Sequence, residues 1–199
     1  MAWSATARYG LDPAPGGLGL VQDLLNTVDA GAPRLPDLLA GVTQAQAWID
    51  EATAQWTAVT GQQVPRVALD ADGLAELRAF RDGLQEATAK AQDAASGAGV
   101  LAPVLHSATA ALRLGDDGLV RLEPRGTGWR RLASLALAAT FEGQQADTRR
   151  RLKTCRNLRC RVAFYDRSRN NSGVWHDVRS CGNAANLRAY RARRRAQGG

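Results

Sequence analysis

The 199-residue sequence contains few cysteines and no long hydrophobic run. Its 3 Cys cannot form the framework of paired disulfides on which small secreted domains rely. No run approaches the ~18 apolar residues of a membrane-spanning helix, so we expect no membrane partner. Residues 1–4 lack the charged and apolar regions that open a signal peptide. These absences predict a cytoplasmic protein.

Lysine is also scarce, at two of the 26 basic residues, so arginine carries almost all of the positive charge. Arginine suits bidentate contacts to phosphate and guanine. The hydrophobic content of 45% and charged content of 23% are ordinary, which excludes a wholly disordered chain and a collagen. The length allows one or two domains with a substantial hydrophobic core.

The two signs of charge are separated along the chain. Residues 1–120 contain 7 Lys or Arg and 14 Asp or Glu, whereas residues 121–199 contain 19 and 5. Residues 149–199 alone contain 15 basic and 2 acidic residues. An acidic body with a basic end predicts two modules with different partners. The basic module suits a polyanion, and nucleic acid is the first candidate.

Residues 1–150 are predicted to be mainly α-helical with one small β-hairpin. Helical spacing predicts four helices. The first starts near Leu20, and the second follows a capping box at Thr43 and Gln46. The third follows a cap at Asp72, and the fourth follows a cap at Thr127. We expect the helix from 43 to end at Gly61, the helix from 72 to break at 96–99, and the helix from 127 to continue into 147–153. No catalytic motif is found in this region. The residues predicted to face the core are Leu20, Val21, Leu24, Leu25, Val28, Ile49, Ala52, Trp56, Val59, Leu74, Leu77, Phe80, Leu84, Ala91, Trp129, Leu132, Ala133, Ala136 and Leu137.

A β-hairpin is predicted between the third and fourth helices. Leu112 and Leu114 alternate with polar residues, as do Val120 and Leu122, on either side of a turn at 115–118. His106 lies in an apolar stretch far from any Cys, so we assign it a structural role.

The cysteines and one histidine form a cluster near the end of the sequence. The spacing Cys155-x4-Cys160-x15-His176-x4-Cys181 supplies four ligands of the kind found in closed structural zinc sites. The alternative is a set of scattered cysteines with a coincidental histidine. A segment of ~45 residues cannot bury enough apolar surface to fold alone, and bound metal would supply the missing free energy. We therefore predict one structural zinc ion per chain.

The residues around this cluster predict a treble-clef-like ββα zinc finger over 151–199. Segments 162–165 and 174–175 are expected to form two paired strands, with a polar turn at 166–173. A helix is expected from Cys181 to about Arg195. Leu187 and Tyr190 would pack on the strands.

The opposite face of this helix is basic, with Arg188, Arg191 and Arg195 in register and Arg193 and Arg194 beside them. A solvated, fraying tail is the simpler interpretation. The lack of compensating acidic residues favours a helix laid against phosphates.

Several short motifs in this region occur together in a known family. The segment resembles the CGNR-type zinc finger of bacterial proteins, and residues 25–29, Leu-Asn-Thr-Val-Asp, resemble the start of that family's N-terminal ABATE domain. The family is regarded as stress-induced transcription regulators, which implies DNA binding. The matching motifs of the finger are Phe164-Tyr165-Asp166, Ser168-Arg169-Asn170, Trp175, Cys181-Gly182-Asn183 and 190–195.

The sequence departs from the family pattern at two positions. His176 stands where the family has a Cys, and because imidazole is a competent zinc ligand the site becomes Cys₃His. Ala184 stands where the name motif has Arg. Position 184 precedes Arg188 by one helical turn, so one contact to phosphate or base is missing there.

These features predict a DNA-binding transcription regulator that is not an enzyme. Its partner would be double-stranded DNA, and the helical domain 1–150 would sense a small-molecule effector or form a homo-oligomer. Asn26, Thr27 and Asp29 are candidate effector contacts. The alternative role for Asn26 and Asp29 is to end the first helix. The residues predicted to contact nucleic acid are Arg167, Arg169, Asn170, Arg188, Arg191, Arg193 and Arg195.

Two other functions fit part of the pattern. A finger that binds RNA or protein would use exposed Phe164, Tyr165 and Trp175 for stacking. A ββα-metal nuclease would use His176 and Asp177, but this His would have to serve as both base and metal ligand.

Overall fold

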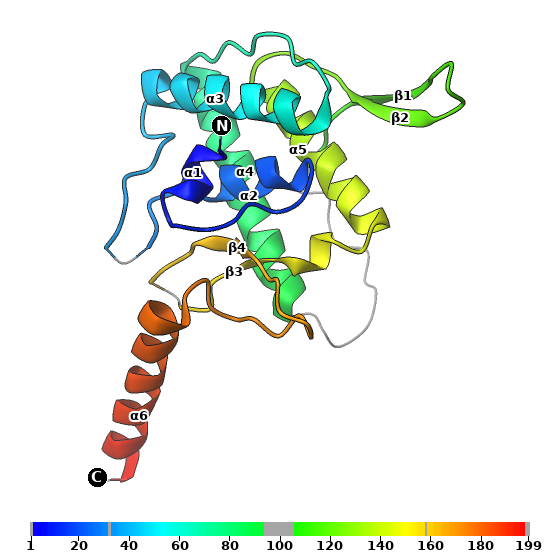
Figure 1. Cartoon of the computed structure of the whole chain (residues 1–199). Coiled ribbons are helices and arrows are strands. Elements are labelled where there is room, and N and C mark those ends of the chain that lie inside the picture. The colour runs from blue at the N-terminus through cyan, green and yellow to red at the C-terminus, as the bar shows by residue number, and fades with distance from the viewer. Residues whose placement is uncertain (1, 32, 94–105, 158, 198–199) are drawn as a thin grey trace.

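The computed structural model describes residues 2–31, 33–93, 106–157 and 159–197. It is mainly α-helical with two small antiparallel hairpins, as the sequence predicts (Figure 1). The helices of the first part of the chain pack around α2, and the C-terminal helix α6 points away from this body. The elements are α1 (Ser4–Ala7), α2 (Leu18–Leu25), α3 (Val42–Thr60), α4 (Ala71–Asp93), β1 (Ala110–Leu114), β2 (Val120–Pro124), α5 (Gly128–Gln145), η1 (Arg149–Arg151), β3 (Leu152–Thr154), β4 (Ala163–Tyr165), η2 (Val178–Gly182) and α6 (Asn183–Gln197).

Helix α2 is the centre of the hydrophobic core. All of its residues are buried, and it contacts α1, α3, α4 and α5. Its close approach to α5 depends on glycine, since a Cβ at Gly143 would lie 2.7 Å from Leu18 Cδ1. The helix ends at Leu25, with Asn26 as its C-cap, so Val28 of the predicted stripe lies beyond it.

The predicted buried stripes are largely confirmed, including Leu77 and Phe80 of α4, which have no exposed surface. Val59 and Ala91 are exceptions, because they lie on the exposed side near the end of their helices. His106 packs edge-on against Phe80, with ring centroids 5.3 Å apart. The predicted break at 96–99 lies outside the described residues.

Two of the predicted helix caps are wrong, and the third, Thr127, stands at the N-cap position of α5 but makes no capping hydrogen bond with its side chain. Helix α3 starts after Gly41 without a side-chain cap, because Gln46 instead donates to the Val67 carbonyl (2.8 Å) and accepts from the Leu69 amide (3.0 Å). Helix α4 is capped by Asp70, which accepts from the Gly73 amide (2.7 Å), and not by Asp72. Gly61 ends α3 in the left-handed conformation, as predicted.

The β1–β2 hairpin has the expected register, in which Leu112 faces Leu122 and Leu114 faces Val120. It extends from the side of the body as a narrow arm (Figure 1). Leu112 and Leu114 are more than 70% exposed, so this arm contributes little to the core.

The predicted continuation of α5 into 147–153 is wrong. Asp147 takes a positive φ of 55°, which ends the helix, and β3 follows the short η1 turn. The partner of β4 is β3, and the predicted strand at 174–175 does not form. The reason is a continuous ladder in which the Cys155 amide donates to the Val162 carbonyl (2.9 Å) directly after β3.

Helix α6 is mostly solvent-exposed. Its contacts with other elements are made mainly with η2, the turn from which it starts. Leu187 and Tyr190 are 48% and 51% exposed, so the prediction that they pack on the finger's strands is wrong. In the part of the chain that the structure describes, no helix is long and apolar enough to cross a membrane.

A buried carboxylate ties α2 to α1 and α3. Asp23 has no exposed surface and accepts hydrogen bonds from the Thr6 amide (2.7 Å) and the Trp48 indole (2.8 Å). Burial raises the pKa of Asp23, and these two hydrogen bonds only partly offset that effect.

This raised pKa predicts a pH-dependent stability. The folded chain keeps the Asp23 proton at pH values where the unfolded chain, with a pKa of ~3.9, has lost it. The contribution of Asp23 to the free energy of unfolding therefore grows as pH falls toward that value, and shrinks as pH rises. Relative to Asp23→Asn, the zinc-loaded wild type should gain stability as pH is lowered from about 7 to about 5. Thermal unfolding followed by circular dichroism tests this, and a constant or opposite difference would contradict it.

Candidate metal centre

The four predicted metal ligands lie together. The sulfurs of Cys155, Cys160 and Cys181 and a ring nitrogen of His176 are all within 4.8 Å of one another. Tetrahedral zinc with Zn–S bonds near 2.3 Å needs ligand atoms about 3.7 Å apart, so small shifts would complete the site. The three cysteines are buried and His176 is half-buried. Nδ1 of His176 is 3.3 Å from the Cys160 sulfur, which places this nitrogen at the cluster.

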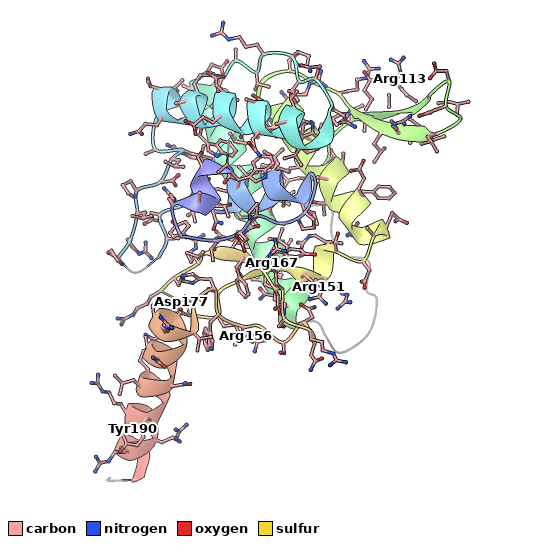
Figure 2. The ribbon with its side chains drawn as sticks, viewed as in Figure 1. Arg113, Arg151, Arg156, Arg167, Asp177 and Tyr190 are labelled. Atoms are coloured by element: carbon pink, nitrogen blue, oxygen red, sulfur yellow. The ribbon has the colours of Figure 1, made fainter. Side chains whose placement is uncertain are left out.

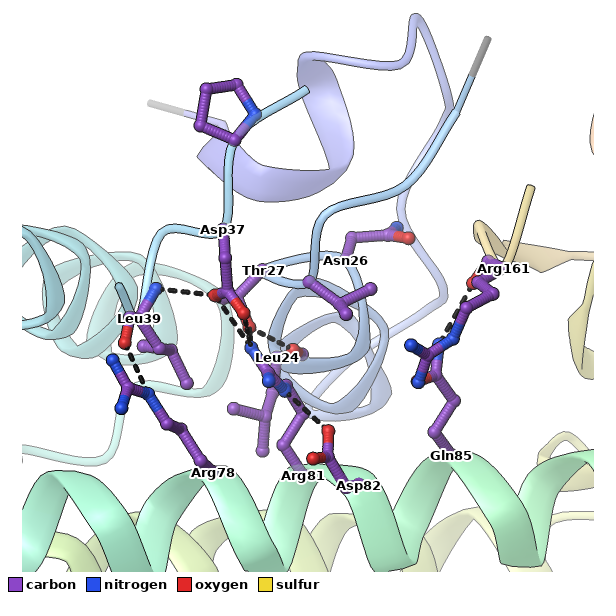
Figure 3. Close-up of polar contacts among 12 residues, drawn as sticks. Leu24, Asn26, Thr27, Asp37, Leu39, Arg78, Arg81, Asp82, Gln85 and Arg161 are labelled. Carbon is purple, nitrogen blue, oxygen red and sulfur yellow. Dashed lines mark hydrogen bonds and ion pairs between the residues drawn. The ribbon is translucent and has the colours of Figure 1, made fainter. Parts of the chain in front are cut away.

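The first two ligands sit on a turn between β3 and β4. The Cys160 amide donates to the Asn157 carbonyl (2.7 Å), which closes the turn. The next residue, Arg161, takes a φ of 64° so that the chain can return into β4. This uncommon conformation is held from α4, because the amide of Gln85 donates to the Arg161 carbonyl (3.0 Å) and accepts from its guanidinium (2.6 Å), as Figure 3 shows.

The last ligand is presented at the start of α6. Asp177 caps the preceding turn by accepting from the Arg179 amide (2.8 Å) and the Ser180 hydroxyl (2.7 Å). The hydrogen bond from Ser180 lowers the pKa of Asp177. The Cys181 amide donates to the Asp177 carbonyl (3.0 Å). The start of a helix favours a thiolate, so Cys181 is in a suitable position for a metal ligand.

Asn157 connects the cluster to α6. Its Nδ2 donates to the Cys181 sulfur (3.2 Å), and its Oδ1 accepts from Nη2 of Arg188 (2.8 Å). Groups that hydrogen-bond a metal ligand fix its orientation and tune metal affinity. One side chain therefore both orients a ligand and holds the first arginine of the basic helix.

The electrostatics of the cluster favour a cation. A hydrogen bond from the Cys160 thiol lowers the pKa of Cys155 to about 4, and the same bond raises the pKa of Cys160. Once one of these buried thiols ionises, the other holds its proton against a second negative charge. A divalent metal removes this conflict because it replaces the protons of all three thiols. The donor set thus fits zinc, which would hold the turn and the start of α6 together.

The helical part of the chain completes the core of this module. Val28 and Ala30 pack in the same apolar cluster as the three cysteines. The amide of Asn26 pairs with the backbone of Ala163, donating to its carbonyl (2.9 Å) and accepting from its N–H (2.8 Å). The Gly31 amide donates to the Cys160 carbonyl (2.9 Å). Residues before and after position 150 therefore share one packed unit around the cluster.

The three candidate effector contacts do not converge on one site. Asn26 is used by Ala163, and the Thr27 hydroxyl donates to the Leu24 carbonyl (2.7 Å). Asp29 pairs on the surface with Arg34.

Thr27 instead belongs to a buried ion-pair network. Arg81, which is 4% exposed, donates to both carboxylate oxygens of Asp37 (2.8 and 2.9 Å) and to the Thr27 hydroxyl (3.3 Å). Figure 3 shows Thr27 and Asp37 meeting at Arg81. This network fixes Thr27 and Asp37 on α4, and with Thr27 its neighbour Val28, which packs in the cysteine cluster.

The residues predicted to contact nucleic acid fall into two groups. Arg167, Arg169 and Asn170 lie on the exposed loop 166–173, where Arg167 donates to the Pro13 carbonyl (2.8 Å) and stacks on Tyr165. Arg188, Arg191 and Arg193 lie on α6. Figure 2 shows Arg167 against the body and Tyr190 far out on α6. The side chain of Arg195 lies outside what the structure describes.

A buried ion pair shapes the first of these loops. Lys153 donates to Asp166 Oδ2 (2.7 Å) and to the Asn171 carbonyl (2.7 Å). Burial alone would raise the pKa of Asp166, but hydrogen bonds from Lys153, Ser168 and Gly173 outweigh it and hold that pKa at about 2. Sequence reasoning missed this pair because Lys153 was assigned to the end of a helix.

Two further supporting residues were also missed. Gln92 of α4 accepts from the Thr154 amide (3.0 Å) and donates to its carbonyl (3.0 Å), which pairs α4 with the edge of β3. Asn157 carried no signal beyond its position between Cys155 and Cys160. Its place between two metal ligands is the one signal by which the sequence could have indicated that it supports the site.

Comparison with known proteins supports the assignment of this module. Residues 151–194 match the family model of the CGNR zinc finger, a segment that contains all four donors. A search of curated proteins found no match to the chain. The match confirms the resemblance of the finger to its family. The donor cluster and this match together fit one structural zinc ion per chain.

Removal of the imidazole should weaken zinc binding. We expect about one zinc per wild-type chain, and an affinity loss in His176→Ala beyond the roughly 10–100-fold effect of losing a group that only supports a ligand. The measurement is zinc content by elemental mass spectrometry together with competition against a chromogenic chelator. His106→Gln is the matched control, because it removes the other histidine and should leave zinc affinity unchanged. Equal zinc affinity of wild type and His176→Ala would contradict this ligand set.

Proposed function

We propose that the protein is a zinc-dependent DNA-binding transcription regulator and not an enzyme. The finger over 151–199 would hold α6 against duplex DNA. The helical domain over 1–150, which resembles the ABATE domain, would sense a ligand or form a homo-oligomer. A stress-induced regulator is the role that the family resemblance implies, and we place it in the cytoplasm.

The observation that carries this proposal is the exposed basic helix α6. Its 15 residues include no acidic side chain, and a helix of this length spans about 22 Å, enough to lie in a major groove. Among the described side chains, Arg191, Arg193 and Arg194 have no ion-pair partner. A free helix of one net sign suits a polyanion, which would neutralise the charge and stabilise the helix.

The zinc site would set the direction of this helix. Arg188 is anchored to Asn157, which contacts the ligand Cys181, so the start of α6 is oriented by the cluster. Arg188 then has fewer donors left for a phosphate than the arginines beyond it. Ala184 removes a further contact at the start of α6. We therefore assign most phosphate contacts to residues 191–195, with further contacts from Arg169 and Asn170 on the loop 166–173.

The alternatives gain less support from the structure. RNA binding by base stacking needs exposed aromatic side chains, but Phe164 is 6% exposed and Trp175 packs against the cysteine cluster. A nuclease needs a histidine free to act as base, but His176 Nδ1 lies against Cys160.

The proposal predicts salt-dependent DNA binding that depends on α6. With about 6 phosphate contacts, the slope of log K against log salt should be roughly −5. Arg191→Gln combined with Arg194→Gln should reduce this slope by about 2 units, because each phosphate contact contributes about 0.9. Fluorescence anisotropy with a labelled duplex, single-stranded DNA and RNA, at several salt concentrations, measures both the slope and the preferred nucleic acid.

The matched control removes the same charge at the other end of the molecule. Arg113 lies on the β1–β2 arm, far from α6 in Figure 2. Arg113→Gln combined with Arg121→Gln should leave the slope unchanged. A wild-type slope near zero, or equal losses in the two double variants, would overturn the proposed role of α6.

A further inference from the structure

A cavity in the helical domain lies between the end of α3, the β1–β2 hairpin and α5. Its volume is about 410 Å³, within the range of small-molecule sites. The walls are mainly apolar. They include Val64, Pro65, Leu114, Leu122 and Leu135. The hairpin arm that forms one wall is exposed along most of its length, whereas α3 and α5 are packed in the core.

One polar group at this cavity is buried without a partner. Trp56 lines the cavity and is 2% exposed, and its indole N–H has no acceptor among the described residues. Nearly all buried N–H groups in folded proteins are hydrogen-bonded, and each exception calls for an explanation. The indole nitrogen has no accessible surface, so a ligand in the cavity would meet the ring of Trp56 and not its N–H.

The cavity also has one cation without a counter-charge. Three charged residues besides Arg131 line it, namely Arg113, Arg121 and Glu123. Glu123 is paired with Arg113 (3.3 Å), and Arg121 is paired with Asp117. Arg131 of α5 is half-buried and donates to the Pro124 carbonyl, and no acidic side chain pairs with it within the described residues. The charge of Arg131 therefore remains available to an anion.

A second cavity in the same domain differs in this respect. It lies at the start of α4 and α5 and is lined by Asp70, Asp72 and Glu76, which would repel an anion. Arg130, the neighbour of Arg131, lines that cavity and stacks on Trp129. The adjacent residues Arg130 and Arg131 of α5 thus line two different cavities, of which the one at Arg130 is more acidic.

We infer that the cavity at Trp56 and Arg131 binds a small apolar monocarboxylic acid. Its carboxylate would pair with Arg131, and its apolar body would cover the leucine walls and the ring of Trp56. The inference deepens the sensor role of the proposed function by naming the site and the ligand class. It moves the effector contacts away from Asn26, Thr27 and Asp29, which the fold uses internally.

Isothermal titration calorimetry of the zinc-loaded full chain tests this inference. The probe is 2-naphthoate, and 2-naphthylmethanol is its neutral analogue. We expect 2-naphthoate to bind the wild type and the neutral analogue to bind at least tenfold more weakly, because a hydrogen bond to a charged group is worth about a factor of ten or more. Arg131→Gln should weaken naphthoate binding by a similar factor.

The controls exclude binding elsewhere on a basic protein. Arg130→Gln should leave naphthoate affinity unchanged, and so should Arg191→Gln combined with Arg194→Gln on α6. Leu114→Glu places a like charge on the cavity wall at a residue that is 72% exposed, so it should weaken binding without disturbing the core. This variant keeps the test decisive even where Arg131→Gln does not fold.

Three results would overturn the inference. They are no binding of naphthoate at about 1 mM, equal affinity for the neutral analogue, and equal weakening by Arg130→Gln and Arg131→Gln. None of them bears on DNA binding, since the titration contains no nucleic acid. A failure here alongside the expected salt slope would leave the DNA-binding proposal standing.

Discussion

The confinement of three cysteine thiols and one imidazole to a small buried space is the constraint on which the rest of the structure depends. The four donor atoms lie within 4.8 Å of one another, and the three sulfurs cannot all ionise there without a cation. A single zinc ion resolves this conflict and joins the β3–β4 turn to the start of α6. Through Asn157, the same site also holds Arg188, so the direction of the basic helix follows from the coordination of Cys181. The residues that bind the metal therefore also orient the positively charged helix.

The zinc module is not folded by zinc alone. Asn26 pairs with the backbone of Ala163 as an additional strand would, and Gly31 donates to the Cys160 carbonyl. The segment that makes these contacts is itself held by the buried pair of Arg81 and Asp37. The acidic helical part and the basic finger are thus mechanically connected around the cluster. Such a connection would link the proposed sensor domain physically to the finger.

The sequence predicted the zinc ligands because cysteine and histidine are rare here and their spacing carries the chemistry directly. It also predicted the helical stripes, the Gly61 cap and the register of the first hairpin, all of which depend on local pattern. It failed where a long-range partner decides the outcome. Segment 174–175 is not a strand, because β4 pairs with β3 instead. Gln46 does not cap a helix, because its side chain bonds the backbone of Val67 and Leu69. The sequence suggested Asn26 as an effector contact. In the fold, both the donor and the acceptor of its side-chain amide are hydrogen-bonded to the backbone of Ala163.

Zinc and the helical domain stabilise the finger as one unit, and the Gly31 amide reports on this coupling most directly. Its hydrogen bond to the Cys160 carbonyl crosses from the helical part to the metal-binding turn. Amide hydrogen exchange followed by NMR, on the zinc-loaded chain and after chelation, measures its protection. We expect Gly31 and the β3–β4 amides to lose protection together when zinc is removed, while the interior of α3 keeps its protection. Protection of Gly31 that survives chelation unchanged would contradict the claim.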